Sequence, residues 1–331
     1  MIKRVFYVLV LGIALYLLIP RLGGLQRNLA ALRHAHLPLM ALGVLVEAAA
    51  LLAYVALYRT VLRAQGAYVS LLAAGQGVMA GFFISHLIPG GAAAGTVANV
   101  KTMQREGVGA RRTGVGVLLT AIVSDIALAV LFLAGLVYSL AKSAVPAGYV
   151  ATALIIIPLL AGLIGVVFLF AYRRELAGAV VNAVARALHR VIKRVNAAEL
   201  ARAACDIADE ARAVLSGRSF RHAFVFALAN WLLDATVLYL FFLAVGHHQH
   251  FGALLVAYAV ANLLSVIPVT PGGLGVMEAT LVAISVGFGS PRSIAFIAVL
   301  GYRLVNFWLP LPVGLVAYVR ARALPAKEVP E

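Results

Sequence analysis

The residues of this sequence that could do chemistry are charged and polar side chains set inside long apolar runs. Arg303 lies within the apolar run Ile294–Val319. Further groups interrupt or border other apolar runs, namely Glu47, His86, Asp125, Asp234 and Glu278. An ionised group at a bilayer centre costs about 2.5–3.5 kcal/mol on insertion scales, so such groups usually face a bundle interior and pair. A planar guanidinium can hold a carboxylate or a phosphate through two hydrogen bonds. We therefore predict an interior ion pair or a phosphate site at Arg303.

Familiar catalytic and metal-binding patterns are absent from the sequence. It contains no HExxH motif, no Gly-rich nucleotide loop and no specific metal-ligand spacing. His247, His248 and His250 form a short cluster, but no cysteine or carboxylate accompanies them. We expect no metal, no cofactor and no enzymatic activity. A membrane glycosyl- or acyl-transferase remains the alternative, because acidic residues near a membrane cavity could serve as bases.

Two segments place proline and glycine next to apolar runs. Ser265–Glu278 lies between Phe251–Ile267 and Leu274–Phe288, each shorter than the roughly 20 residues of a spanning helix. Ser85–Gly95 follows the apolar run Tyr68–Leu87. Proline and glycine oppose an uninterrupted helix, and paired breaks in two halves indicate a transporter site. We expect two re-entrant hairpins, although ordinary loops between short helices remain open. The residues expected at the breaks are Pro89, Gly90, Gly91, Pro271, Gly272 and Gly273.

The composition indicates an all-α, polytopic membrane protein. Of 331 residues, 63% are hydrophobic and 12% are charged, which no soluble domain of this length matches. Long unbroken apolar runs, rather than alternation, exclude a β-barrel. The net charge of +15 is concentrated in the connections, as the positive-inside rule predicts, so we expect no nucleic-acid partner. Val5–Ile19 lacks a small-x-small cleavage site and is predicted to be a retained first helix.

Charge in the connections predicts the topology. The interval 173–222 holds ten Lys/Arg and five Asp/Glu, and this excess places it in the cytoplasm. Its helical periodicity favours a helix on the inner leaflet or on the protein's own cytoplasmic face. Counting from it places both termini in the cytoplasm and gives units 37–140 and 223–319 opposite orientations within one domain, an inverted repeat. Three residues do not fit the positive-inside rule, because this topology places them on the external side of the membrane, namely Arg21, Arg27 and Arg33. Full spanning by Tyr68–Leu87 would correct them but would put the N-terminus outside.

Lys101 and Arg105 are four residues apart and share one helix face after the first break. They fit ordinary positive-inside anchoring. Alternatively, they attract anionic headgroups to the cytoplasmic mouth of a lipid pathway.

Several motifs resemble one known family. Ile267–Glu278, with the sequence Ile-Pro-Val-Thr-Pro-Gly-Gly-Leu-Gly-Val-Met-Glu, looks like the signature of the lysylphosphatidylglycerol synthetase transmembrane-region family, also called flippase-like. Gly301-Tyr302-Arg303, Trp308-Leu309-Pro310, Gly314, Asn230-Trp231, Asp234 and Pro89-Gly90-Gly91 fit the same pattern. The resemblance covers nearly the whole chain. The soluble aminoacyl-transferase domain of fused members is not expected here, so we expect no lipid-modifying catalysis.

The resemblance implies a site and a function. Glu278 becomes the expected partner of Arg303 because their motifs occur together in the family, with Asp125 and Asp234 as alternatives. The pair either locks two helices or exchanges its carboxylate for a lipid phosphate during transport. The implied function is a flippase of the bacterial inner membrane. Its substrate would be (aminoacyl-)phosphatidylglycerol or an isoprenoid- or hopanoid-linked lipid. A non-transporting partner of a separate lipid-modifying enzyme and a homo-oligomer remain open.

Overall fold

The computed structural model describes residues 35–88, 91–142, 158, 162, 165, 210–215, 217–265 and 270–323. Every regular element in these ranges is helical. Four helical stretches are long and apolar enough to cross a membrane, namely Leu37–Ala64, Ala110–Ser139, Gly217–Ala244 and Arg292–Ala323. The prediction of an all-α membrane protein is confirmed for this part of the chain. The predicted first helix, the termini and most of the interval 173–222 lie outside the described residues.

The described helices fall into two series with the same order. The first series is α3 (Leu37–Ala64), α4 (Leu71–Leu87), α5 (Ala92–Arg105) and α6 (Ala110–Lys142). The second is α10 (Gly217–Ala244), α11 (Phe251–Ser265), the 3₁₀ turn η1 (Pro271–Gly273), α12 (Val276–Gly287), α13 (Arg292–Arg303), the π-helical turn η2 (Leu304–Trp308) and α14 (Pro310–Ala323). Each series is a long helix, two short helices and a long final helix. The division into the predicted units 37–140 and 223–319 stays a prediction.

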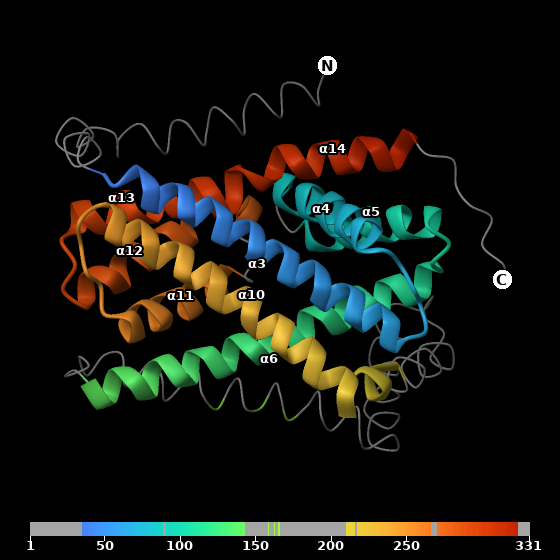
Figure 1. The fold of residues 1–331 in the computed structure, drawn as a ribbon, viewed down its shortest axis with the longest axis horizontal. Helices are drawn as coiled ribbons and strands as arrows, with labels where there is room; N and C mark the ends of the chain where they lie inside the picture. Colours follow the sequence, from blue (N-terminus) through green and yellow to red (C-terminus); the bar gives the residue numbers. More distant parts are fainter. Residues whose placement is uncertain are drawn as a thin grey trace, which may run out of the picture.

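The first helices of the two series, α3 and α10, run antiparallel across the middle of the molecule (Figure 1). The His36 amide at the start of α3 donates to the Ala244 carbonyl at the end of α10, at 2.9 Å. Farther along, Asn230 Nδ2 donates to the Ala50 carbonyl at 3.0 Å. The leading helices of the two units therefore point in opposite directions, as they must in an inverted repeat. The orientation of either unit in a membrane stays a prediction.

Short helices of each series pack against the final helix of the other series. The α4–α5 pair lies on α14, and α11 lies on α6. Small residues permit both approaches. A Cβ atom on Gly314 would lie 2.7 Å from the Met79 carbonyl oxygen, and one on Gly135 would lie 2.7 Å from the Leu255 Cβ. This arrangement also brings α4 into contact with η1 at the second break.

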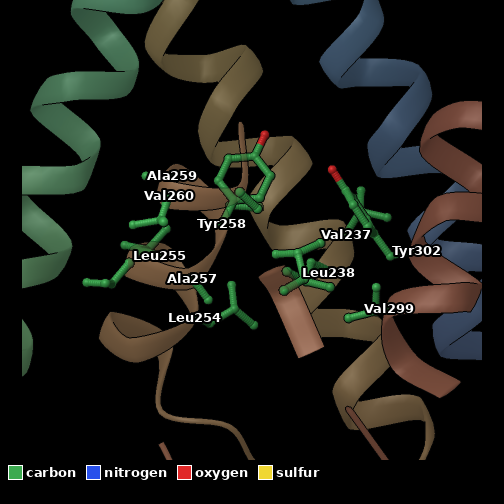
Figure 2. Close-up of a cluster of buried hydrophobic side chains, with 14 of the residues drawn as sticks. Val237, Leu238, Leu254, Leu255, Ala257, Tyr258, Ala259, Val260, Val299 and Tyr302 are labelled. Carbon is green, nitrogen blue, oxygen red and sulfur yellow. The ribbon is translucent and has the colours of Figure 1, made fainter. Parts of the chain in front are cut away.

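The largest buried cluster lies between α10, α11 and α13 (Figure 2). Aliphatic side chains such as Leu238, Leu254 and Val299 fill it. Tyr258 and Tyr302 stand at its edge, and their hydroxyl groups point to the same side, away from the aliphatic side chains (Figure 2). A polar atom in such surroundings needs a hydrogen-bond partner, so the tyrosines mark the border between the apolar core and a polar site.

Candidate functional site

The second helix break is built from glycines in left-handed conformations. Gly272 has φ +58°, Gly273 has φ +67° and Gly275 has φ +85°. Such angles cost a residue with a Cβ, so the sequence Pro-Gly-Gly-Leu-Gly ends one helix path and starts another. The next helix, α12, begins at Val276. The Glu278 Oε2 atom accepts a hydrogen bond of 2.6 Å from the Gly275 amide, which caps α12 and holds this carboxylate at the break.

Arg303 binds the second break from the end of α13. Its Nε donates to Glu278 Oε1 at 2.6 Å, and its Nη2 donates to the Gly272 carbonyl at 3.1 Å. Nη1 lies 3.4 Å from the Met277 sulfur, and the guanidinium stands 4.4 Å from the centre of the Phe307 ring. Only 3% of Arg303 is exposed. The ion pair with Glu278 is the predicted one, and it fixes the break to α13.

The end of α4, just before the first break, lies against Phe307 of η2 and against Gly272 of the second break. The His86 ring lies with its centre 5.3 Å from that of Phe307, edge to face. Its Nδ1 lies 2.8 Å from the Phe82 carbonyl oxygen and 3.0 Å from Ser85 Oγ. A Cβ atom on Gly272 would come 2.8 Å from His86 Cδ2. The end of α4 therefore packs against the second break, beside the Phe307 ring that lies next to the Arg303 guanidinium.

Gly91 supports the first break through close backbone contact. It precedes α5, and a Cβ atom there would overlap the carbonyl oxygens of Ser85 and Ile88. Any larger residue would push α5 away from the end of α4. The predicted site residues Pro89 and Gly90 lie outside the described residues.

Asp234 occupies a separate polar cluster and does not pair with Arg303. The Tyr258 hydroxyl donates to Asp234 Oδ2, and the Tyr302 hydroxyl donates to the same oxygen at 3.0 Å. Asn306 Nδ2 donates to Asp234 Oδ1 at 2.9 Å. The alternative that Asp234 is the partner of Arg303 is therefore wrong. Tyr302 and Arg303 are consecutive on a helix, so their side chains point about 100° apart and serve different clusters.

Asp125 on α6 is also not the partner of Arg303. It is half-buried, and its electrostatic neighbour is Tyr54 on α3. Among the described residues, no hydrogen bond or ion pair joins it to Arg303. The capping position of Glu278 at the break gives that carboxylate the closer approach.

Lys101 and Arg105 lie toward the far end of α5 from the break. Helix α5 begins at Ala92. At 1.5 Å per residue, Lys101 lies about 14 Å and Arg105 about 20 Å along the axis from that start. Lys101 is exposed and Arg105 is half-buried. They do not touch the Arg303 site, and a role in attracting headgroups stays a prediction.

The sequence singled out Asp234 and Glu47 but not the side chains that donate hydrogen bonds to Asp234, namely Tyr258, Tyr302 and Asn306. Asn306 joins the two carboxyl groups, because its Nδ2 also lies 3.4 Å from Glu47 Oε1. An amide inside an apolar run was the available signal for Asn306. Tyr258 gave no signal, and Tyr302 stood out only as part of the family motif Gly301-Tyr302-Arg303, which did not indicate a contact with Asp234. The π-helical turn that carries Asn306 has no sequence pattern of its own.

The histidines that follow α10 show no metal site. His247 Nε2 lies 3.0 Å from Ser290 Oγ, a contact with the turn before α13. Within the described ranges, no three His, Cys, Asp or Glu side chains are arranged to hold a metal ion.

Comparison with known proteins gives one family and several relatives. The family model described as "Lysylphosphatidylglycerol synthase TM region" matches residues 5–314. A UPF0104 membrane protein of Pyrococcus horikoshii is 21% identical over 342 residues, covering 96% of this chain and 98% of the relative. A UPF0104 membrane protein of Methanothermobacter thermautotrophicus is 33% identical over 93 residues, so that the match spans only 28% of each protein. Inner membrane protein YbhN of Escherichia coli is 28% identical over 102 residues, or 30% of this chain and 31% of the relative. No solved structure matches the chain.

Proposed function

The chain belongs to the lysylphosphatidylglycerol synthase TM region family, and we propose that it is a flippase. The proposed cargo is an amphipathic lipid with a phosphate-bearing headgroup, such as (aminoacyl-)phosphatidylglycerol or an isoprenoid- or hopanoid-linked lipid. The proposed location is the bacterial inner membrane, since an E. coli relative is named an inner membrane protein. The reaction moves the lipid between leaflets and changes no covalent bond.

The observation that carries this proposal is the buried guanidinium of Arg303, which binds the second break where the end of α4 packs against that break. Its Nη1 faces the Met277 thioether, which is a weak acceptor. A phosphate oxygen is a much stronger acceptor and matches the planar fork of the guanidinium. Carriers built from inverted repeats bind their substrates at broken helices near the bilayer midplane. The position and chemistry of Arg303 both fit that use.

The contacts of Arg303 also suggest how a lipid phosphate enters. Glu278 is the more exposed member of the ion pair, with 18% of its side chain accessible against 4% for Arg303. It already has a second partner in the Gly275 amide. A phosphate that displaces Glu278 from Arg303 would therefore leave the carboxylate capped at the start of α12 rather than unpartnered. The exchange replaces one charge-assisted pair by another, which keeps the free-energy difference between the two states small.

Purified protein in liposomes tests the proposal. A phosphatidylglycerol analogue with a fluorescent acyl chain is placed in the outer leaflet, and the fraction that becomes protected from a membrane-impermeant quencher is followed over time. We expect faster protection than in empty liposomes, with no new product by mass spectrometry. A new covalent product would support the transferase instead. If there is no protection and no new product, with this lipid or with an isoprenoid phosphate, the result would support a non-transporting partner.

A matched pair of variants identifies the site. Arg303→Lys keeps the charge and loses the fork, so the rate should fall at least severalfold. Arg59→Lys is the control, because the Arg59 Nε also donates to a backbone carbonyl, that of Val69, at 2.9 Å but lies outside the site. An equal effect of both changes would remove Arg303 from the proposed site.

A further inference from the structure

A pair of carboxyl groups lies in the interior beside the Arg303 site. Glu47 on α3 and Asp234 on α10 are 2% and 6% exposed. One side-chain amide bridges them, because Asn306 Nδ2 lies 3.4 Å from Glu47 Oε1 and 2.9 Å from Asp234 Oδ1. Two carboxylates that share one site do not both ionise readily, because like charges repel strongly away from water.

Hydrogen bonding distinguishes the two carboxyl groups. Asp234 accepts from three neutral donors, on Tyr258, Tyr302 and Asn306. Glu47 Oε2 is fully buried and has no hydrogen-bond partner among the described residues. Three donors stabilise a charged carboxylate, whereas a buried oxygen with no donor leaves a negative charge uncompensated. The negative charge therefore belongs on Asp234, and Glu47 is the group that carries a proton.

We propose that Glu47 and Asp234 form a proton-binding site that holds one proton, on Glu47, and exchanges it during lipid movement. The exchange during lipid movement rests on the proposed function, whereas the binding of the proton does not. In the exchange, the O–H bond of Glu47 breaks and its electron pair stays on the carboxylate. The proton passes to water on the side of the membrane to which the site is then open. A metal cation fits less well, because it needs several oxygen ligands and the groups facing Asp234 are donors.

The other charged and titratable groups nearby face different partners. From α13, Arg303 pairs with Glu278 of α12. From α4, His86 lies beside the Phe307 ring and the second break. From α6, Asp125 interacts electrostatically with Tyr54 of α3. The groups turned toward the Glu47–Asp234 pair are then the two tyrosines and the Asn306 amide described above.

The bridging amide links the proton to the substrate site. Asn306 lies in the π-helical turn η2, three residues after Arg303 and next to Phe307. Such turns are often found at functional sites. Loss of the proton would place two negative charges on either side of one amide, and their repulsion would separate α3 from α10 and release Asn306. Because η2 follows Arg303 directly, this movement would change how the guanidinium is presented to a lipid.

Infrared spectroscopy of the purified wild-type protein tests the proton site without any lipid cargo. A protonated carboxyl group has a C=O stretch that a carboxylate lacks. At neutral pH we expect this band, and we expect isotopic labelling of glutamate carboxyls, but not of aspartate carboxyls, to shift it. Glu47→Gln should abolish the glutamate band, whereas the matched Glu278→Gln should retain it. A glutamate band that is absent, that survives in Glu47→Gln or that disappears on addition of sodium ions would overturn the proposal.

The liposome assay tests the coupling. The wild-type rate with the phosphatidylglycerol analogue should change with pH, and Glu47→Gln, which is permanently neutral, should move lipid at a rate that no longer varies with pH. An unchanged pH profile in Glu47→Gln would refute the coupling while leaving transport intact. If no lipid moves at any pH, the proposed function and the coupling both fail, and the infrared result alone decides the proton site.

Discussion

At the scale of single residues, Arg303 stands out because its guanidinium contacts several groups at once. It donates to the Glu278 carboxylate and to the Gly272 carbonyl, and it lies over the Phe307 ring. The apolar pattern identified Arg303 as a buried cation, and the family resemblance favoured Glu278 over Asp125 and Asp234 as its partner. Glu278 is chosen because it also caps α12, which places its carboxylate at the break. Asp234 is already occupied by neutral donors.

Truncation of Arg303 should reveal the energy of this pair. We expect Arg303→Ala to lose about 3–5 kcal/mol of stability, because it removes the contacts with Glu278 and Gly272 and leaves the charge of a partly buried carboxylate without its countercharge. Adding Glu278→Gln should recover most of that loss, since the glutamine carbonyl can still accept from the Gly275 amide and carries no charge. Thermal unfolding in detergent measures both. A double variant no more stable than Arg303→Ala would show that the Glu278 charge is not what destabilises the single variant.

At the scale of elements, proline and glycine predicted the two helix breaks, but nothing predicted the π-helical turn in the last helical stretch. Proline and glycine predicted the interruptions after α4 and α11, and both are present in the structure. The final apolar run, Ile294–Val319, gave no sign of an interruption, whereas α13 and α14 are joined by the π-helical turn η2. Leu304–Trp308 contains neither proline nor glycine, so no local propensity marks this turn. The structure places its Asn306 and Phe307 in contact with other helices, and such contacts are not visible in one sequence.

Gly272 tests whether the second break must pack so closely. A Cβ atom there would overlap the Phe307 ring and crowd His86, and the backbone is left-handed. We expect Gly272→Ala to destabilise the protein by more than Gly66→Ala. Gly66 is the matched control, because its φ is +79° but nothing lies within 4 Å of its would-be Cβ. Gly66→Ala then measures backbone strain alone, about 1–2 kcal/mol.

Thermal unfolding of both alanine variants gives the comparison. Replacing Phe307 with leucine in the Gly272→Ala background should recover part of the loss by making room. Equal destabilisation by the two glycine changes would mean that the break can relax away from Phe307, and the packed arrangement of the site would be wrong.

At the scale of the whole molecule, the order of the helices could be predicted, but the packing of helices from one unit against the other unit could not. Apolar runs and charge placement predicted two similar units with opposite orientation. The packing of the α4–α5 pair on α14, and of α11 on α6, crosses between the units. Contacts between lipid-embedded helices depend on small residues and close fit, as at Gly314 and Gly135, and not on a hydrophobic pattern. One sequence therefore gives the parts of the site without showing which parts meet.

Because α3 and α10 are antiparallel, the loops that follow them are expected to face opposite sides of the membrane. Tyr68 follows α3 and His248 follows α10, and both are exposed. In a Cys205→Ser background, we expect a membrane-impermeant maleimide to label His248→Cys in intact cells. Tyr68→Cys should be labelled only after the cells are opened. Labelling of both from the same side would contradict the opposed orientation of the units.

The central claim is that Arg303 serves a lipid phosphate and not only Glu278. The most direct measurement is lipid movement in liposomes by Arg303→Gln/Glu278→Gln, which carries no charge at the pair, after thermal unfolding has shown that it folds. We predict that this protein moves the phosphatidylglycerol analogue no faster than empty liposomes, although it is more stable than Arg303→Ala. Transport at the wild-type rate by the same protein would show that the pair only holds two helices together, and the phosphate role would have to be abandoned.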